Sequence, residues 1–354
     1  MSLLFSPIQL RDLAIKNRAW VSPMCQYSAV DGVPNQWHLV HLGGFAKGGA
    51  GLVMAEATAV VPEGRISPND AGLWNDEQRA AWAPIVDFIH GQGAAAAIQL
   101  GHAGRKASTQ TPWEGRGVVE DADGGWDVVA PSPIAYPDMK VPHELTVAEI
   151  AEVVDAFGAA AQRAVEAGFD VVEIHGAHGY LLQEFLSPLS NRRTDDYGGS
   201  LPNRARFLLE VVAEVRRRTP SGMPLLARIS GSDWHDDGWS VEDSVELAPL
   251  LSEVGADLVD VSSGGNAVVR IPLEPGYQVR FAHAVRAKTG VATGAVGLIT
   301  EARQAEEILA GGSADVVFLG RALLREPHWP LLAAHELGDD IAWPLQYDRA
   351  RPRD

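Results

Sequence analysis

The sequence predicts an α/β protein of the (β/α)8 TIM-barrel class, with an N-terminal β-hairpin cap and a long loop after the third strand. One observation is a recurring unit, in which an amphipathic helix ends near a Gly and a short apolar run follows at once. Clear copies follow Ala167-Gly168, Val254-Gly255 and Gly311-Gly312, and a weaker copy begins at Gly49. A second observation is that eight apolar runs alternate with helices, which is the number and order of elements in a (β/α)8 barrel.

The predicted strands are short and mostly apolar, without clean alternation, as expected for parallel strands that are buried on both faces. They cover residues 17–21, 51–57, 94–100, 170–175, 224–230, 257–262, 291–295 and 315–319. A doubly wound sheet is the structural alternative. No GxGxxG opens a βαβ unit in this chain, which favours the barrel. We expect one domain over residues 1–354.

Helices are predicted between the strands, at 36–48, 76–91, 147–166, 203–218, 241–253, 277–288 and 301–310. The third has a good start signal, because Thr146 and Glu149 form a capping-box pair. Residues 8–10 and 13–15 form the predicted hairpin. The longest connection, 101–146, leaves the third strand at the end where barrel active sites lie, and its length is typical of a lid, a binding loop or disorder.

Composition excludes several classes of function. The net charge is −17 and no basic stripe is present, so a nucleic-acid partner is not expected. The single cysteine, Cys25, excludes an internal disulfide and a CxxC metal site, and it fits a reducing compartment. The first residues lack a signal-peptide pattern, and no apolar run approaches the roughly 20 residues of a membrane span. We therefore expect a cytoplasmic protein without a membrane partner.

The segment His175-Gly176-Ala177-His178-Gly179-Tyr180 ends the fourth predicted strand. Two neutral imidazoles can both donate to one oxygen while the phenol supplies a proton, which is electrophilic catalysis of a carbonyl compound. A zinc site is one alternative, although no third ligand is obvious, and plain loop histidines are another.

Three further residues lie where strand ends should converge. Arg228 is a permanent charge inside an apolar run, so it requires an anionic partner. Gln99 can donate and accept at once, which suits the edge of a heterocycle, though an ordinary strand-end turn explains it equally well. Cys25 is either a thiol near a redox centre or, more commonly for a lone cysteine, a small buried hydrophobe.

The seventh and eighth strands end in Gly294 to Gly297 and Gly320-Arg321. Backbone N–H groups at these two strand ends form the usual phosphate site of barrels, and Arg321 adds charge. The segment from Asn191 to Ser200 is predicted to be mainly structural. The tail 336–354 follows the completed barrel; solvated tails are the default, while Tyr347 and Arg349 could instead reach a neighbouring site.

Taken together and in this order, the motifs resemble the Old Yellow Enzyme family of FMN-dependent ene-reductases, within the NADH:flavin oxidoreductases. The chain is most similar to the thermophilic-like class, which has a cysteine beside the flavin. The resemblance runs from Phe5 to Tyr347 and is carried by Ser22-Pro23-Met24-Cys25-Gln26-Tyr27, Gln99 to Arg105, His175 to Tyr180, Asn191 to Ser200 and Gly320-Arg321.

This resemblance implies a role for each matching residue. The flavin ring would lie against Ser22, Pro23, Met24, Cys25, Ala57, Gln99 and Arg228, and the phosphate against Gly297, Gly320 and Arg321. His175 and His178 would bind the substrate carbonyl, and Tyr180 would be the proton donor unless water replaces it. Tyr27 would line the substrate pocket. Arg349 would insert into the active site of a partner subunit, which implies a homodimer or homotetramer.

The implied function is reduction of activated C=C bonds in α,β-unsaturated carbonyl compounds, with noncovalent FMN, NADPH as reductant and NADH as the second possibility. No resident metal is expected. Other flavin barrels, such as hydroxy-acid oxidases and dihydroorotate-type dehydrogenases, would need a different catalytic set. A non-catalytic flavin-binding barrel and a metal-dependent TIM-barrel hydrolase that uses the HxxH segment remain alternatives.

Overall fold

The computed structural model describes residues 1–115 and 117–352, so the last two positions of the predicted tail 336–354 lie outside the described residues. Within it, parallel strands close into a barrel in the order β3, β4, β5, β8, β9, β10, β11 and β12, and β12 pairs back with β3. Their bounds are Ala19–Val21, Leu52–Ala59, Ala95–Gly101, Val171–Gly176, Leu225–Ser230, Leu258–Ser262, Thr293–Ala295 and Val316–Leu319. The predicted (β/α)8 class is confirmed.

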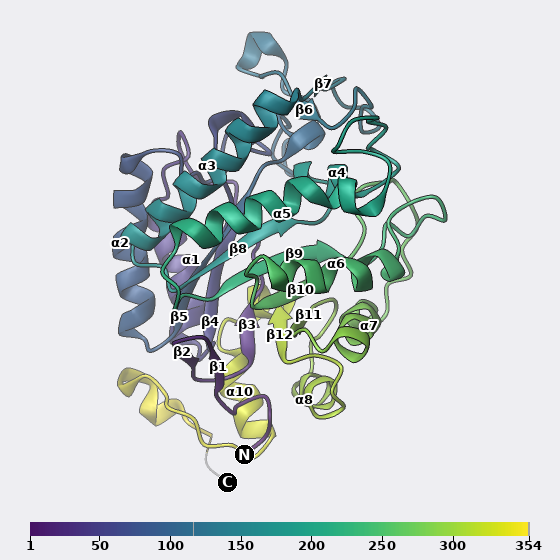
Figure 1. The fold of residues 1–354 in the computed structure, drawn as a ribbon. Coiled ribbons are helices and arrows are strands. Elements are labelled where there is room, and N and C mark those ends of the chain that lie inside the picture. Colours follow the sequence, from purple (N-terminus) through teal and green to yellow (C-terminus); the bar gives the residue numbers. More distant parts are fainter. Residues whose placement is uncertain (116, 353–354) are drawn as a thin grey trace.

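Helices surround the barrel (Figure 1). Those that alternate with the strands are α1 (Gln36–Lys47), α2 (Asp76–Gly91), α3 (Val147–Glu166), α5 (Leu201–Arg218), α6 (Val241–Glu253), α7 (Val279–Thr289) and α8 (Ala302–Ala310). The capping box predicted for the 147–166 helix is present, since the Thr146 hydroxyl accepts from the Glu149 amide and the Glu149 carboxylate accepts from the Thr146 amide. Three short helices were not predicted: α4 (Leu181–Leu186), α9 (Arg321–Arg325) and α10 (Trp329–Glu336).

The strand boundaries differ from the predicted ones where side chains bind the backbone. The strand predicted from residue 17 begins at Ala19, because the Asn17 side chain donates to the Gly49 carbonyl and accepts from the Ala19 amide. The strand predicted from residue 291 begins at Thr293, after the Thr289 hydroxyl accepts from the Val291 amide. Such local bonds compete with ladder pairing.

The N-terminal hairpin, β1 (Ile8–Leu10) and β2 (Leu13–Ile15), lies below the strands in Figure 1. Its Leu10 and Ile15 belong to a buried apolar cluster whose other members are Trp20, Leu52, Met54, Ala97, Val171, Leu226, Leu258, Val316 and Phe318. These come from the barrel strands and fill the lower half of the interior. The hairpin therefore closes the amino-terminal end of the barrel, as predicted.

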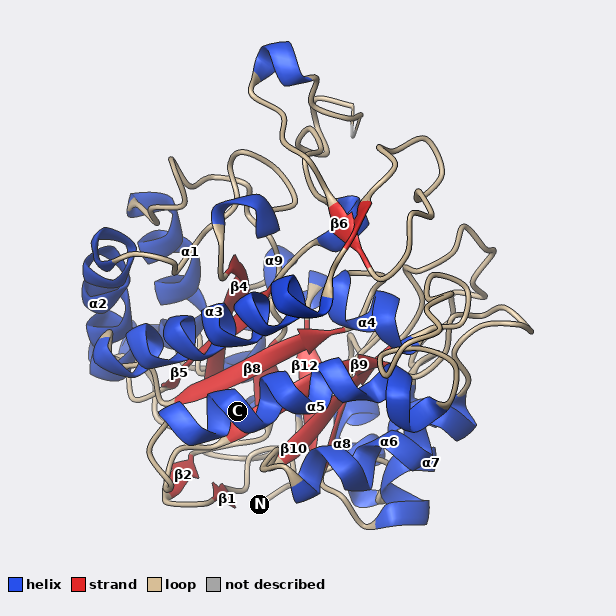
Figure 2. Cartoon of the chain, turned by 45° about the horizontal axis from the view of Figure 1, so that its top comes forward, coloured by secondary structure: helices blue, strands red, loops and turns tan. Residues whose placement is uncertain are grey.

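The long connection after β5 crosses the opposite end and carries a small parallel pair, β6 (Val129–Ala130) and β7 (His143–Glu144). Figure 2 shows it projecting beyond the carboxyl ends of the strands. It is anchored to the segment after β4, because the Trp126 indole donates to the Glu63 carbonyl and the Thr109 amide donates to the Ile66 carbonyl. Across the described residues, no helix has both the length and the apolarity needed to cross a membrane.

Candidate active site at the carboxyl ends of the strands

The turn after β8 brings His175, His178 and Tyr180 together. The ring of His175 lies 5.1 Å from that of His178 and 5.1 Å from that of Tyr180, edge-on in both cases. The turn depends on Gly179, at φ of 69°, because a Cβ there would lie 2.3 Å from the Gly265 carbonyl oxygen. His178 itself has φ of 62°, an uncommon backbone conformation for a residue with a side chain.

Both imidazoles are held neutral by their surroundings. Burial lowers the pKa of His175 and of His178 well below the ordinary range, and the positive charges of Arg228 and Lys106 lower both further. The Nδ1 of His175 accepts from the Ala177 amide at 3.3 Å, which leaves Nε2 as the N–H donor. The Nε2 of His178 bonds the Ser262 hydroxyl at 2.7 Å. When the Ser262 hydroxyl donates to this nitrogen, Nδ1 carries the proton and can donate into the site; when the hydroxyl donates to Gln278 Oε1 at 3.4 Å, Nε2 carries it.

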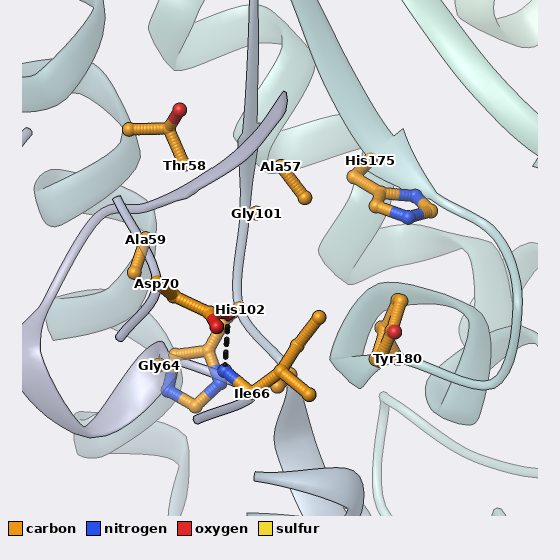
Figure 3. A pocket seen from close by; sticks show the side chains of 11 residues that line it. Ala57, Thr58, Ala59, Gly64, Ile66, Asp70, Gly101, His102, His175 and Tyr180 are labelled. Carbon is orange, nitrogen blue, oxygen red and sulfur yellow. Dashed lines mark hydrogen bonds between the residues drawn. The ribbon is translucent and has the colours of Figure 1, made fainter. Parts of the chain in front are cut away.

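Tyr180 stays a phenol. Burial raises its pKa well above the ordinary value, and the negative charges that Cys25, Tyr27 and Asp70 can carry add to this. The ammonium of Lys106 lies 4.8 Å from the centre of the Tyr180 ring, and it donates to the His178 carbonyl at 2.8 Å. Figure 3 shows Tyr180 and His175 on one side of a small pocket that has Asp70 and His102 on its other side.

The segment from Ser22 to Tyr27 follows β3 and forms another part of the site. Burial raises the pKa of the Cys25 thiol, and the carboxylates of Asp70 and Glu56 raise it further, so the thiol stays protonated. Glu56 accepts from the Gln26 amide at 2.8 Å and pairs with buried His38 at 3.1 Å, which fixes the segment. The Tyr27 ring meets Trp113 of the long connection edge-on, 5.8 Å between centres.

Ala57 faces Gln99 across the β4–β5 pair, because a register shift at Glu56 separates Ala55 from Ala57. Glu56 is thereby available to bind Gln26 and His38. Met24, which precedes Cys25 in the chain, lies near Gly320, since a Cβ added to that glycine would be 3.7 Å from the Met24 sulfur. The segments that follow β3 and β12 thus approach each other, while Ala57 and Gln99 pair on β4 and β5.

Below them lies a layer of buried polar side chains. The amide nitrogen of Gln99 donates to Glu173 at 2.7 Å, and Arg228 pairs with Asp260 at 3.0 Å and donates to the Ser22 hydroxyl at 3.2 Å. The anionic partner that the sequence requires for Arg228 is therefore Asp260. The strand pairing aligns His175 with Arg228 and Arg228 with Asp260, so this layer lies beside the His175 turn.

The ends of β11 and β12 enclose a cavity of about 130 Å³. Gly297, Gly320 and Arg321 line it together with Gln278 and Arg325. Gly297 has φ of 117°, and a Cβ at that position would lie 2.7 Å from the Gln278 side chain. Two guanidinium groups, and backbone N–H groups that a ligand can approach closely at the glycines, are suited to bind a phosphate. Together with the buried Arg228 and Gln99, this donor set fits an FMN molecule.

Arg349 is the predicted site residue that the fold does not bring to the others. It lies exposed in a short 3-10 helix, Leu345–Ala350, in the yellow tail at the lower left of Figure 1. Tyr347 in the same turn accepts from Lys47 at 2.8 Å and packs against His328. The tail lies toward the amino-terminal end of the barrel, away from the His175 turn of its own chain.

Sequence reasoning missed Glu173, Asp260, Glu56 and Lys106. The first two were within its reach, because each is a charged residue inside an apolar strand, the signal that identified Arg228. Among the described residues, no cluster of three or more His, Cys, Asp or Glu side chains is arranged to hold a metal ion.

Comparisons with known proteins identify the family and agree with the fold. The NADH:flavin oxidoreductase / NADH oxidase family matches residues 3–340. A solved structure of morphinone reductase is 28% identical with a TM-score of 0.80, covering 97% of this chain and 91% of that one. Morphinone reductase in complex with tetrahydroNAD is 29% identical with a TM-score of 0.79, covering 96% and 92%.

A third structure, the complex of 2-naphthoyl-CoA reductase with 2-naphthoyl-CoA, has a TM-score of 0.86 at 24% identity. It covers 95% of this chain, which spans about half (52%) of that longer protein. At this identity the likeness concerns the fold.

We expect His175 and His178 to remain neutral from about pH 6 to 8, with His175 as the Nε2–H tautomer. The unfolded chain takes up protons below about pH 6.5 while the folded site does not, so this part of the folding stability is lost as the pH falls below that value. Nitrogen-15 NMR of the imidazoles, assigned with single His→Asn variants, measures the protonation state and the tautomer of each ring. A ring that protonates near pH 6.5 would contradict the arrangement.

Proposed function

Because the chain belongs to the NADH:flavin oxidoreductase / NADH oxidase family, whose chemistry depends on FMN, we propose that it is an ene-reductase of the Old Yellow Enzyme type. It would reduce the activated C=C bond of α,β-unsaturated carbonyl compounds. The observation that carries this proposal is the convergence of two neutral imidazoles and one phenol beside the Arg228 layer.

The cofactor site is proposed from the residues that fit it. Ser22, Pro23, Met24, Cys25, Ala57, Gln99 and Arg228 would hold the FMN ring, and Gly297, Gly320 and Arg321 the phosphate. Bound FMN supplies hydride transfer from a nicotinamide to the alkene. Arg228 favours negative charge at the edge of the ring next to it, and the protonated Cys25 adds none of its own.

His175 and His178 would hold the substrate carbonyl oxygen. His175 offers its Nε2–H and His178 would offer its Nδ1–H, with Ser262 donating to Nε2. Neither ring carries a positive charge that would repel an incoming nicotinamide. Two donors stabilise the negative charge that develops on the oxygen as the β-carbon is reduced. Tyr27, edge-on to Trp113, would line the mouth of the pocket.

Tyr180 would deliver a proton to the α-carbon. Its hydroxyl is protonated at neutral pH, and Lys106 above the ring stabilises the phenolate that forms on donation. Solvent returns the proton at the end of the cycle. A water molecule in the same pocket is the alternative donor.

We propose NADPH as the reductant and NADH as the alternative, the latter supported by the tetrahydroNAD complex of morphinone reductase. The assembly would be a homodimer or homotetramer, because the tail of one chain lies away from its own site. We propose the cytoplasm as its compartment. In that assembly Arg349 would contact substrate in the partner subunit.

The purified protein should be yellow, with the absorbance of oxidised flavin, and should oxidise NADPH anaerobically when cyclohexenone is added. A protein that binds FMN but does not turn over the enone is a non-catalytic flavin-binding barrel. A colourless protein that cannot be reconstituted with FMN, and whose activity follows a bound metal, would instead support the barrel hydrolase.

Replacing His175 and His178 together with Ala should abolish the charge-transfer band that para-substituted phenols give with the bound flavin, while FMN is retained. Enone reduction should fall by roughly 10²–10³ for each donor removed. The matched control replaces the exposed His283 and His335 with Ala. A phenol complex that is unchanged in the double variant would place the oxygen site elsewhere.

Arg349→Ala should raise the KM for the enone and leave the thermal midpoint unchanged, because the side chain is exposed and, in its own chain, lies outside the core. The exposed Arg303→Ala serves as the control for loss of surface charge. Identical kinetics for Arg349→Ala and the parent enzyme would remove the tail from the site.

A further inference from the structure

Two carboxyl groups and one guanidinium share the barrel interior beneath the candidate active site. Glu173 of β8 and Asp260 of β10 are fully buried, and Arg228 of β9 lies on the strand between them. Arg228 Nε is 3.0 Å from Asp260 Oδ2. Glu173 Oε1 accepts from Gln99 at 2.7 Å, whereas Glu173 Oε2, both Asp260 oxygens and Arg228 Nε have no hydrogen-bond partner in the described residues, so Arg228 and Asp260 are held together by charge.

The charges in this layer do not balance when both acids are ionised. Arg228 supplies one positive charge and the two carboxylates would supply two negative ones, in a region without solvent. The layer's other polar contacts are Gln99 on β5 and Ser22 after β3, which are uncharged. The other titratable groups that feel the charge of Arg228 are His175 and His178, which are neutral, and Tyr277, whose raised pKa keeps it a phenol. An uncompensated buried carboxylate is costly, and such groups bind a proton instead.

The two acids differ in their distance from the cation, and this decides where the proton lies. Asp260 makes the direct ion pair with Arg228, while Glu173 meets only the neutral amide of Gln99. Burial and the charge of Asp260 raise the pKa of Glu173 to about 8 against the pull of Arg228. Burial also raises the pKa of Asp260, but the adjacent charge of Arg228 lowers it through the direct ion pair. The first proton therefore belongs to Glu173.

We propose that Glu173 is a positioning residue of the cofactor site, with a proton on Oε2 and with Oε1 holding the amide nitrogen of Gln99. Asp260 alone then balances Arg228. The amide of Gln99 is fixed with its oxygen toward the pocket, where it can accept from a ring N–H. This role rests on the proposed function, since it concerns the floor on which FMN would lie.

Ionisation of Glu173 would change that floor. A second negative charge would compete for Arg228 and add an anion below a ring that gains negative charge on reduction. FMN affinity should therefore fall as the pH rises through about 8. If FMN binding shifts the pKa of Glu173 by one unit, the alkaline loss of affinity is about tenfold.

Infrared spectroscopy of the protein without added substrate tests the protonation directly. The parent-minus-Glu173→Gln difference spectrum at pH 7 should contain the C=O stretch of a protonated carboxylic acid that loses intensity on titration to alkaline pH. Asp260→Asn should remove this band, because Arg228 would then pair with Glu173 and ionise it. A carboxylate signal from Glu173 at pH 7 in the parent protein would overturn the proposal.

FMN dissociation constants from pH 6 to 10, measured by fluorescence, test the positioning role. The parent should lose affinity on the alkaline side, Glu173→Gln should bind FMN with little pH dependence, and Glu173→Ala should bind it more weakly at every pH. Glu184→Gln is the control, since Glu184 is another buried acid whose pKa burial raises to about 8, hydrogen-bonded instead to the Arg105 amide. It should keep the parent pH dependence.

Equal pH dependence in the parent and in Glu173→Gln would refute the positioning role. A parent protein that binds no FMN at any pH would instead overturn the proposed function. The infrared measurement needs no FMN, so it would still show whether Glu173 carries the proton. Enone reduction is not used as a readout in either arm.

Discussion

The buried charge of Arg228 is the constraint on which the rest of the site depends. A guanidinium inside a closed barrel cannot lose its proton and must be paired, and the neighbouring strand supplies Asp260 in register. The same charge lowers the pKa values of His175 and His178, after burial, and tethers Ser22 at the start of the cysteine segment. One residue thus adds to burial in keeping the histidines of the turn neutral, and it fixes part of the position of the segment opposite it.

In this barrel, the buried charges that destabilise the fold and the apolar side chains that stabilise it lie in different regions. Its lower interior contains an apolar cluster that includes Leu10 and Ile15 of the hairpin, and a second apolar layer lies between the strands and the helices. Burial of apolar surface in these two regions contributes the favourable free energy. Glu173, Arg228 and Asp260 lie on the barrel strands above this apolar cluster. The hairpin therefore supports function by allowing the polar layer to exist at one end.

The sequence was sufficient for the barrel because its repeated helix–Gly–strand unit is a local pattern. It was also sufficient for the His175 turn, where Gly and a strand end occur together. The sequence did not predict the contact of Glu56 with Gln26. That contact depends on a register shift between Ala55 and Ala57, which leaves no periodic pattern in the sequence. Short helices such as α4 carry too few turns to give a pattern. Pairings such as Gln99 with Glu173 depend on strand register, which follows from closure of the whole sheet.

Two non-glycine residues on the substrate side of the site, Tyr27 and His178, have positive φ. The His178 amide donates to Ser230, its carbonyl accepts from Lys106 and its imidazole bonds Ser262. Such a conformation costs of order 1–3 kcal/mol, so it persists only where the surroundings over-determine it. Lys106 acts on both residues of the turn, because the ammonium that holds the His178 carbonyl also lies over the Tyr180 ring. The bonds that fix the strained turn are therefore the ones that set the electrostatics of its donors.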